Sequence, residues 1–95
     1  MSCAYVVGRI TVTDPERWAE YRARVPGTLA PWAGELVFRG RQAELMAGED
    51  PHPDIVVIRF PSLEAARGWH ASPAYRALVP LRGRAADVVL AMYEA

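Results

Sequence analysis

Residues 5–16, YVVGRITVTDPE, hold the pattern from which the architecture of this chain follows. Side chains of residues 5–13 alternate between two faces and include many β-branched residues, which is typical of a strand. Asp14 can cap free backbone N–H groups, Pro15 suits the first position of a helix, and Glu16 favours the positive end of the helix dipole. The sequence therefore predicts a strand that runs directly into a helix.

The helix is expected to continue because apolar residues follow at spacings of three and four on one face, namely Trp18, Tyr21, Val25, Leu29 and Trp32. Pro26-Gly27 interrupts this pattern, since proline removes a backbone donor and collides with the preceding turn. We therefore expect a kink or two short segments, with Gly34 ending the helix.

A hairpin of two strands is predicted in the middle of the chain. Residues Glu35 to Met46 alternate twice around Gly40, which fits a bulged or hairpinned edge strand. Residues Ala47 to Asp54 contain two prolines, a glycine and three acids and therefore form a surface loop. Residues Ile55 to Phe60 read as a buried strand.

A second helical region and a last strand complete the pattern. Ser62 can cap a helix whose inner stripe contains Leu63, Ala66 and either Trp69 or His70. Ser72-Pro73 restarts a short helical turn through Tyr75, Leu78 and Val79 that stops near Pro80. Residues Ala86 to Tyr93 form the last strand.

The resulting order, β-α-β-β-α-β, predicts a single α+β domain over residues 1–95 with a ferredoxin-like fold, a four-stranded antiparallel sheet and both helices on one face. One face of the sheet is wholly apolar and should lie under the helices: Val6, Ile10, Val12, Leu36, Phe38, Val56, Ile58, Phe60, Val88, Leu90 and Met92. The other face is too apolar for a monomer in water: Tyr5, Val7, Arg9, Thr11, Val37, Arg39, Ile55, Val57, Arg59, Val89, Ala91 and Tyr93. We expect a homodimer through sheet-to-sheet packing, a dimeric α/β barrel.

Composition excludes several classes of function. The 95 residues have a formal net charge of zero, which gives no basic excess for a nucleic-acid backbone. The longest apolar run, from Val88 to Tyr93, is far below the roughly 20 residues that span a bilayer, so we expect a soluble, cytoplasmic protein with neither nucleic-acid nor membrane partners. Cys3 is the one cysteine, which excludes an internal disulfide and a cysteine-cluster metal site.

Motifs along nearly the whole chain resemble the domain-of-unknown-function family 1330, within the dimeric α/β-barrel group: Tyr5-Val6-Val7, Val12-Thr13-Asp14-Pro15, Tyr21, Val25-Pro26, Gly34, Arg39-Gly40, Phe60-Pro61-Ser62-Leu63-Glu64-Ala65-Ala66, Trp69, Ser72-Pro73, Tyr75 and Pro80-Leu81-Arg82. The sequence departs from the family pattern at Arg41, Arg59, His70 and Ala74, where a glycine, a glutamate, an aromatic residue and a glutamate are usual. The resemblance implies the fold and a homodimer. Better-known relatives of the wider group include cofactor-independent monooxygenases, lactone isomerases and haem enzymes.

The densest cluster of polar and aromatic residues contains Trp69, His70, Ser72, Tyr75 and Arg82. His70 can lie at the margin of the buried stripe, where an imidazole can abstract a proton near neutral pH. The competing interpretation is a half-exposed histidine on a helix flank. Trp69 and Tyr75 are more often packing residues with a polar handle than ligand contacts.

Arg9, Arg39 and Arg59 are expected on the same outer face, where Glu35 and Asp87 are available to pair with them. A buried guanidinium needs a carboxylate or several carbonyls as partners. Either these arginines are compensated across the dimer, which we favour, or one of them, best Arg39, is reserved for an anionic ligand. The same two alternatives hold for Arg82.

Two functional hypotheses from different classes follow. The favoured one is binding of a small aromatic or anionic metabolite in a pocket between helices and sheet, with ligand contacts from Tyr21, Arg39, Trp69, Tyr75 and Arg82. The alternative is a cofactor-independent monooxygenase or isomerase in which His70 transfers a proton. A pocket of about 300 Å³ or more near His70, with convergent polar groups, would favour the enzyme.

No known catalytic motif is present, and we predict neither a metal nor a cofactor. A structural zinc site is disfavoured because the two histidines are His70 and His52, and His52 lies in a loop. A haem on His70 is a minor alternative, since it requires a deep apolar cavity.

Overall fold

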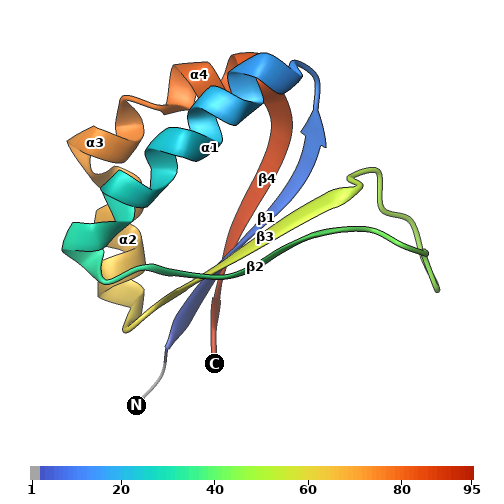
Figure 1. Ribbon diagram of the computed structural model, residues 1–95. Coiled ribbons are helices and arrows are strands. Elements are labelled where there is room, and N and C mark those ends of the chain that lie inside the picture. Colours follow the sequence, from blue (N-terminus) through green and yellow to red (C-terminus); the bar gives the residue numbers. More distant parts are fainter. Residues whose placement is uncertain (1–2) are drawn as a thin grey trace.

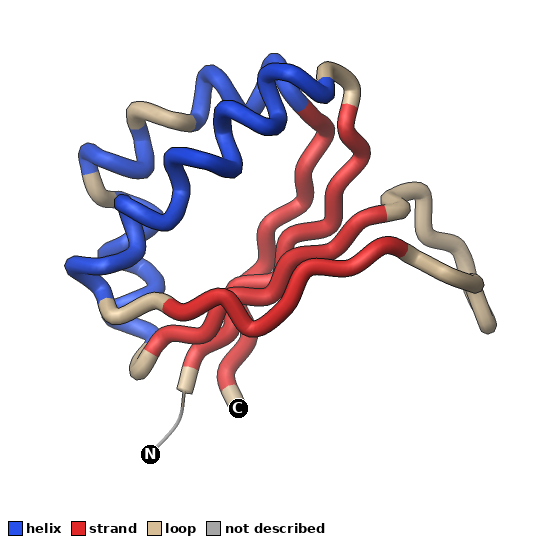
Figure 2. Tube along the Cα trace, viewed as in Figure 1, coloured by secondary structure: helices blue, strands red, loops and turns tan. Residues whose placement is uncertain are grey.

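The computed structural model describes residues 3–95. Four strands form one antiparallel sheet in the order β2-β3-β1-β4, with bounds β1 Ala4–Val12, β2 Glu35–Arg41, β3 Asp54–Phe60 and β4 Ala86–Glu94. The helices cover one face of this sheet (Figures 1 and 2), with bounds α1 Pro15–Leu29, α2 Leu63–Ala71, α3 Pro73–Arg76 and α4 Val79–Ala85. The predicted ferredoxin-like α+β fold is confirmed.

Side-chain caps begin the helices where the sequence predicts them. The Asp14 carboxylate accepts a hydrogen bond from the Arg17 amide at 3.2 Å, and the Ser62 hydroxyl accepts one from the Ala65 amide at 3.1 Å. These acceptors satisfy amides that the first helical turn leaves unpaired. The caps fix the residue at which each helix begins after the preceding strand.

The first helix is not divided into two segments, because Pro26 lies inside α1. The carbonyl that loses its helical donor belongs to the exposed Arg22, where water can satisfy it. A short 3₁₀ turn, Ala30–Trp32, follows α1, and the chain then reverses at Ala33, which has a φ of +56°. The left-handed residue that ends the helical segment is therefore Ala33, one residue before the expected Gly34.

Pro80 also differs from its predicted role, since it lies in the first turn of α4 and does not stop a helix. Proline is well suited to this position because the first turn needs no donor from it. The helical region after Ser72 thus continues as α3 and α4 up to the start of β4.

Strand β2 contains an irregularity that changes which side chains face the helices. Leu36 pairs with Ile58 while Phe38 pairs with Val57, so Val37 is an extra residue, a β-bulge. One extra residue shifts the alternation of side chains by one position. Phe38 was therefore predicted on the wrong face, because it lies on the side away from the helices.

The predicted bulge in an edge strand is confirmed, but its position and the strand's length differ. The bulge lies at Val37 and not around Gly40, and β2 ends at Arg41 and not at Met46. Residues 42–53 connect β2 to β3 and project beyond the sheet (Figures 1 and 2).

The core lies between the helices and the sheet. Its largest fully buried side chains are Ile10, Phe60, Trp69 and Tyr75, from β1, β3, α2 and α3. Gly34 is required here by close approach, because a Cβ would come within 2.8 Å of the Phe60 ring. Trp69, and not His70, occupies the inner stripe of α2.

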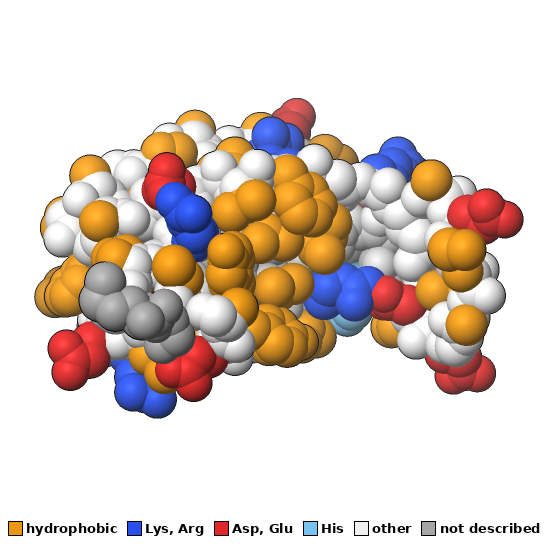
Figure 3. Space-filling view, turned by 90° about the horizontal axis from the view of Figure 1, so that it is seen from below, with side chains coloured by type: hydrophobic (Ala, Val, Ile, Leu, Met, Phe, Trp, Pro, Cys, Tyr) orange, Lys and Arg blue, Asp and Glu red, His pale blue; other side chains and the backbone are white. Residues whose placement is uncertain are grey.

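The other side of the sheet carries no helix and is called the outer face below. By strand register it contains Tyr5, Val7, Arg9, Thr11, Phe38, Ile55, Val57, Arg59, Val89, Ala91 and Tyr93. Figure 3 shows a continuous apolar area on this side of the molecule. Phe38, Val89 and Tyr93 are each about half exposed, at 48%, 51% and 56%.

The first and last strands are neighbours in the sheet, although they are at opposite ends of the sequence. Cys3 and Ala95 exchange two backbone hydrogen bonds, at 2.9 and 3.1 Å. Within residues 3–95, no helix is long and apolar enough to cross a bilayer.

Candidate functional site

The β-bulge brings Arg39 to the helix side of the sheet. Arg39 pairs with Val56, whose side chain faces the core. The sequence analysis placed Arg39 on the outer face with Arg9 and Arg59, and this was wrong because the extra residue at Val37 reverses the alternation. Its guanidinium therefore lies at the opening between α1 and the sheet.

This opening is a groove of about 250 Å³ lined by Ile10, Trp18, Arg22, Arg39, Gly40, Asp54 and Ile55. Among the described residues, no carboxylate lies within ion-pair distance of Arg39. Burial lowers the pKa of Arg39, and the neighbouring charge of Arg22 lowers it further, while Tyr21 acts in the opposite direction. Among residues 3–95, Arg39 is thus a partly buried cation that forms no ion pair.

The two arginines that do lie on the outer face are compensated within the chain. Arg59 Nη2 lies 2.5 Å from Glu35 Oε1, and Arg9 forms an ion pair with Asp50. Glu35 was an expected partner, whereas Asp50 was not. Of the three arginines that the sequence analysis compared, Arg39 is the one for which the described residues provide no ion pair.

Three of the predicted site residues form a buried chain of hydrogen bonds. The Arg82 guanidinium donates to the Tyr75 hydroxyl at 2.8 Å, and the Tyr75 and Tyr21 hydroxyls lie 2.8 Å apart. Tyr21 is 7% exposed and Tyr75 is fully buried. Burial raises the pKa of Tyr21 far above its ordinary value, and the neighbouring Tyr75 adds to this effect. Tyr21 is therefore a neutral hydroxyl at every physiological pH.

Trp69 fixes the aromatic part of this interior. Its ring lies 4.2 Å from the ring of Tyr75, centroid to centroid, and its indole N–H donates to the Thr28 hydroxyl at 2.9 Å. The polar atom of Trp69 is thus used inside the protein. A ligand would contact its ring and not its N–H group.

A second cavity, of about 220 Å³, lies between α2 and β4. It is lined by Val6, Ala66, Arg67, Trp69, His70, Leu90, Ala91 and Met92. A narrow void of about 20 Å³ lies between this cavity and the groove at Arg39 and shares residues with both, including Trp18, Arg39, Trp69 and Leu90. The void is thus lined by residues of both openings and by Tyr21.

His70 lies at the rim of the second cavity and is exposed to solvent. Partial burial lowers its pKa below the ordinary value, and the charges of Arg82 and Arg76 act in the same direction. The imidazole is consequently neutral near pH 7, which is the form that accepts a proton. The cavity beside it is smaller than the 300 Å³ expected for the enzyme.

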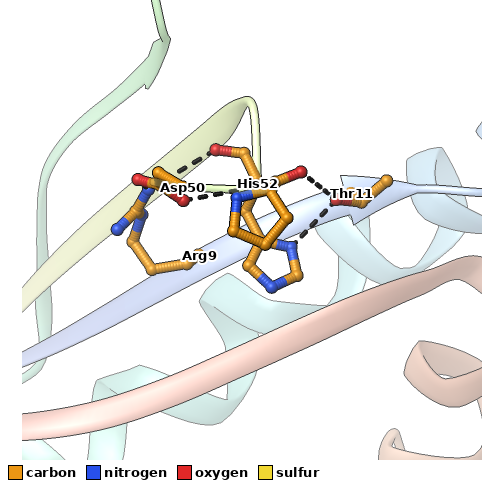
Figure 4. A network of polar contacts seen from close by, with 5 residues as sticks. Arg9, Thr11, Asp50 and His52 are labelled. Carbon is orange, nitrogen blue, oxygen red and sulfur yellow. Dashed lines mark hydrogen bonds and ion pairs between the residues drawn. The ribbon is translucent and has the colours of Figure 1, made fainter. Parts of the chain in front are cut away.

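A polar network on the outer face was missed by the sequence analysis. The Thr11 hydroxyl lies 2.9 Å from His52 Nδ1, the Asp50 carboxylate accepts from the His52 amide at 3.1 Å, and Arg9 joins Asp50 (Figure 4). The residues from β1 and those from the loop before β3 are about 40 positions apart in the sequence, so no local sequence pattern predicts the network. The network fastens the segment before β3 onto β1.

A groove of about 300 Å³ lies beside this network and includes Arg9, Asp50 and His52 among its lining residues. Within the described part of the chain, Arg9 Nε is buried without a hydrogen-bond partner. No group of three or more histidine, cysteine or acidic residues in residues 3–95 is arranged to hold a metal ion.

Comparison with known proteins places this chain in context. The model of a family described as a domain of unknown function, DUF1330, matches residues 3–95. No curated protein matches the sequence.

Several solved structures share the fold. A protein of unknown function from Rhodopseudomonas palustris superposes with a TM-score of 0.83 at 17% identity, over 99% of this chain and 82% of that one. A dimeric ferredoxin-like protein of unknown function from Jannaschia sp. CCS1 gives 0.78 at 13% identity, over 98% and 99% of the two chains. SnoaB, a cofactor-independent oxygenase from Streptomyces nogalater, gives 0.72 at 17% identity, over 100% and 94%. At these identities the likeness shows the fold alone.

Proposed function

This chain belongs to the DUF1330 family, and from that membership and the geometry of the site we propose that it binds a small aromatic or anionic metabolite between the helices and the sheet. The observation that carries the proposal is Arg39, a partly buried cation at the mouth of the groove without a carboxylate partner among the described residues. Ligand pockets commonly combine an apolar wall with few polar groups. Trp18 and Ile10 supply the wall here.

Benzoate is a suitable first probe because it joins an aromatic ring to a carboxylate. Millimolar benzoate is expected to shift the NMR signals of the Trp18 indole N–H and the Arg39 amide, since both residues line the groove. Trp32 lies in the 3₁₀ turn after α1 and lines none of the cavities described, so its indole serves as an internal control. Signals of Trp18 and Arg39 that stay unchanged, or that shift no more than Trp32, would refute the proposal.

We propose further that two copies pack outer face to outer face in a homodimer. The apolar outer face supports this arrangement, because burial of half-exposed Phe38, Val89 and Tyr93 removes apolar area from water. Ferredoxin-like neighbours described as dimeric point the same way. Most residues that line the two openings lie on the helix side, so we expect both openings to stay accessible in such a dimer.

The second candidate function is a cofactor-independent oxygenase, and the position of His70 favours it. His70 is neutral at pH 7 and borders a cavity of about 220 Å³, so it can accept a proton from a bound carbon acid. The carbanion then gives its electrons to dioxygen. With anthrone as the probe, one anthrone and one dioxygen give one anthraquinone and one water, without any redox cofactor.

Oxygen uptake in the presence of anthrone separates this candidate from simple binding. His70→Gln should lower the rate about a hundredfold, the usual contribution of general acid–base catalysis, and leave benzoate binding at Arg39 unchanged. Oxygen uptake by the wild-type protein no faster than in buffer, or equal uptake by the variant, would refute the oxygenase candidate. The proposed binding function would then remain as the single candidate.

A further inference from the structure

The buried chain of hydroxyl groups has one fixed hydrogen bond, from Arg82, and one that can form in either direction, between the two tyrosines. A guanidinium only donates, so the Tyr75 oxygen accepts from Arg82. Tyr75 is fully buried, and the Tyr21 oxygen is the acceptor that the described residues offer to its proton. Either hydroxyl can donate to the other, and each order leaves one buried donor without a described acceptor, which is costly. An acceptor next to Tyr21 therefore favours the order in which Arg82 donates to Tyr75 and Tyr75 donates to Tyr21.

This order leaves the proton of the Tyr21 hydroxyl free for another acceptor. Tyr21 and Arg39 line the same small void, and each contributes to the electrostatic environment of the other. Two donors of different kinds, a neutral hydroxyl and a guanidinium, therefore face one interior space. Neither has a carboxylate or carbonyl partner within the described residues.

The surroundings of these donors select a shape as well as a charge. Trp18 stacks on Tyr21, with ring centroids 5.1 Å apart and an angle of 26° between the planes, and it also lines the groove at Arg39. Arg22 adds a second positive charge to the groove, and Asp54 adds one negative charge. A flat apolar wall next to paired donors suits a ring that carries an oxyanion.

We propose that Arg39 and the Tyr21 hydroxyl together form a receptor for the oxyanion of an aromatic carboxylate or phenolate, with Trp18 against its ring. Tyr75 and Arg82 are positioning residues that direct the Tyr21 proton toward the ligand. This receptor rests on the proposed binding function and gives it a substrate class. Arg39 contributes a positive charge, and Tyr21 contributes a directed hydrogen bond. A neutral ligand does not gain the charge-assisted part of this binding.

Two probes of nearly equal size test the receptor, benzoate and the neutral benzyl alcohol, by NMR titration of each variant. Arg39→Gln and Tyr21→Phe should each lower the affinity for benzoate at least tenfold. Each should change the affinity for benzyl alcohol less than twofold. Asp54→Asn should tighten benzoate severalfold because it removes the one negative charge of the groove. Arg24→Gln is the matched control, since Arg24 lies on α1 but pairs with Glu20 in solvent, and it should change neither affinity.

The positioning role needs its own readout, because a loosened core would weaken both probes equally. Tyr75→Phe should lower the ratio of benzoate to benzyl alcohol affinity about threefold or more while benzyl alcohol still binds. Arg82→Gln should do the same, and Arg82→Lys, which keeps a charged donor, should restore much of the ratio. A ratio that is unchanged in Tyr75→Phe would overturn the relay through Tyr75.

The outcomes separate the receptor from the binding function. If benzoate binds the wild-type protein and binds Arg39→Gln and Tyr21→Phe equally well, the receptor is refuted and the binding function stands. If neither probe binds the wild-type protein, the binding function fails and the receptor fails with it. If Tyr21→Phe does not fold, Arg39→Gln decides, because Arg39 makes no described hydrogen bond that folding requires.

Discussion

Two helical glycines of this chain have opposite surroundings and make a matched pair. A Cβ on Gly68 of α2 would collide with the Trp32 ring, whereas a Cβ on Gly83 of α4 would meet nothing within 4 Å. Alanine gains about 1 kcal/mol over glycine in a helix, but overpacking costs about 1–3 kcal/mol. In urea denaturation, Gly83→Ala should therefore raise the free energy of unfolding and Gly68→Ala should lower it. Equal gains in both would mean that Trp32 moves aside freely.

His70 gives the protein a pH dependence whose sign follows from its lowered pKa. Between about pH 7 and 5 the unfolded chain, with a histidine pKa near 6.5, takes up the proton more readily than the folded chain. Stability contributed by neutral His70 is present above that range and is lost as the pH falls through it. His70→Gln should flatten this part of a plot of unfolding free energy against pH. Parallel curves for both proteins across the whole range would contradict the assignment.

Strand β2 predicts an unusual tolerance to deletion. Removing a residue from a strand normally sends every later side chain to the opposite face. Here Val37 is the extra residue of the bulge, so its deletion leaves Phe38 opposite Val57 and Arg39 opposite Val56. The deletion variant should keep its fold, lose about 1 kcal/mol or less, and keep the NMR response of Arg39 to benzoate. Loss of that response with the fold intact would show that the bulge also aims the guanidinium.

The same strand shows how much of the secondary structure can be predicted from the sequence. β1, β3 and β4 alternate without interruption, so the faces of Val6, Ile58 and Leu90 are readable from a period of two. The bulge carries no glycine or proline to mark it, and so Arg39 was predicted on the wrong side. Pro80 begins a helix in the structure but reads in the sequence as a stop.

Candidate site residues were readable for similar reasons. Tyr21 and Trp69 lie on apolar helical stripes, and both are at the interior as the stripes predict. The contact of Arg82 with Tyr75 spans seven residues across two short helices, and the pairing of Arg9 with Asp50 depends on how a long loop folds back. Spacing along the chain contains neither piece of information.

At the scale of the whole molecule, the outer face makes a prediction about assembly. Val89 is half exposed on this face. An aspartate there would be buried without a partner in the dimer and would destabilise it. In the monomer the same charge would be solvated, so the fold should be unaffected. In analytical ultracentrifugation Val89→Asp should sediment as a monomer with unchanged circular dichroism. Leu36→Asp is the control, because Leu36 is equally exposed but lies on the helix side, and it should remain dimeric. A dimeric Val89→Asp would place the interface elsewhere.

The position of β1 between β3 and β4 has a consequence for the order in which the sheet can form during synthesis. Neither neighbour of this strand exists until the ribosome has passed residue 54, and the second appears only with residues 86–94. Strand β1 must therefore stay unpaired until residues 54–60 are made, and it gains its second neighbour only with residues 86–94. Because contacts between distant segments form slowly, the pairing of β1 with β4 is expected to be a slow step in folding of the sheet.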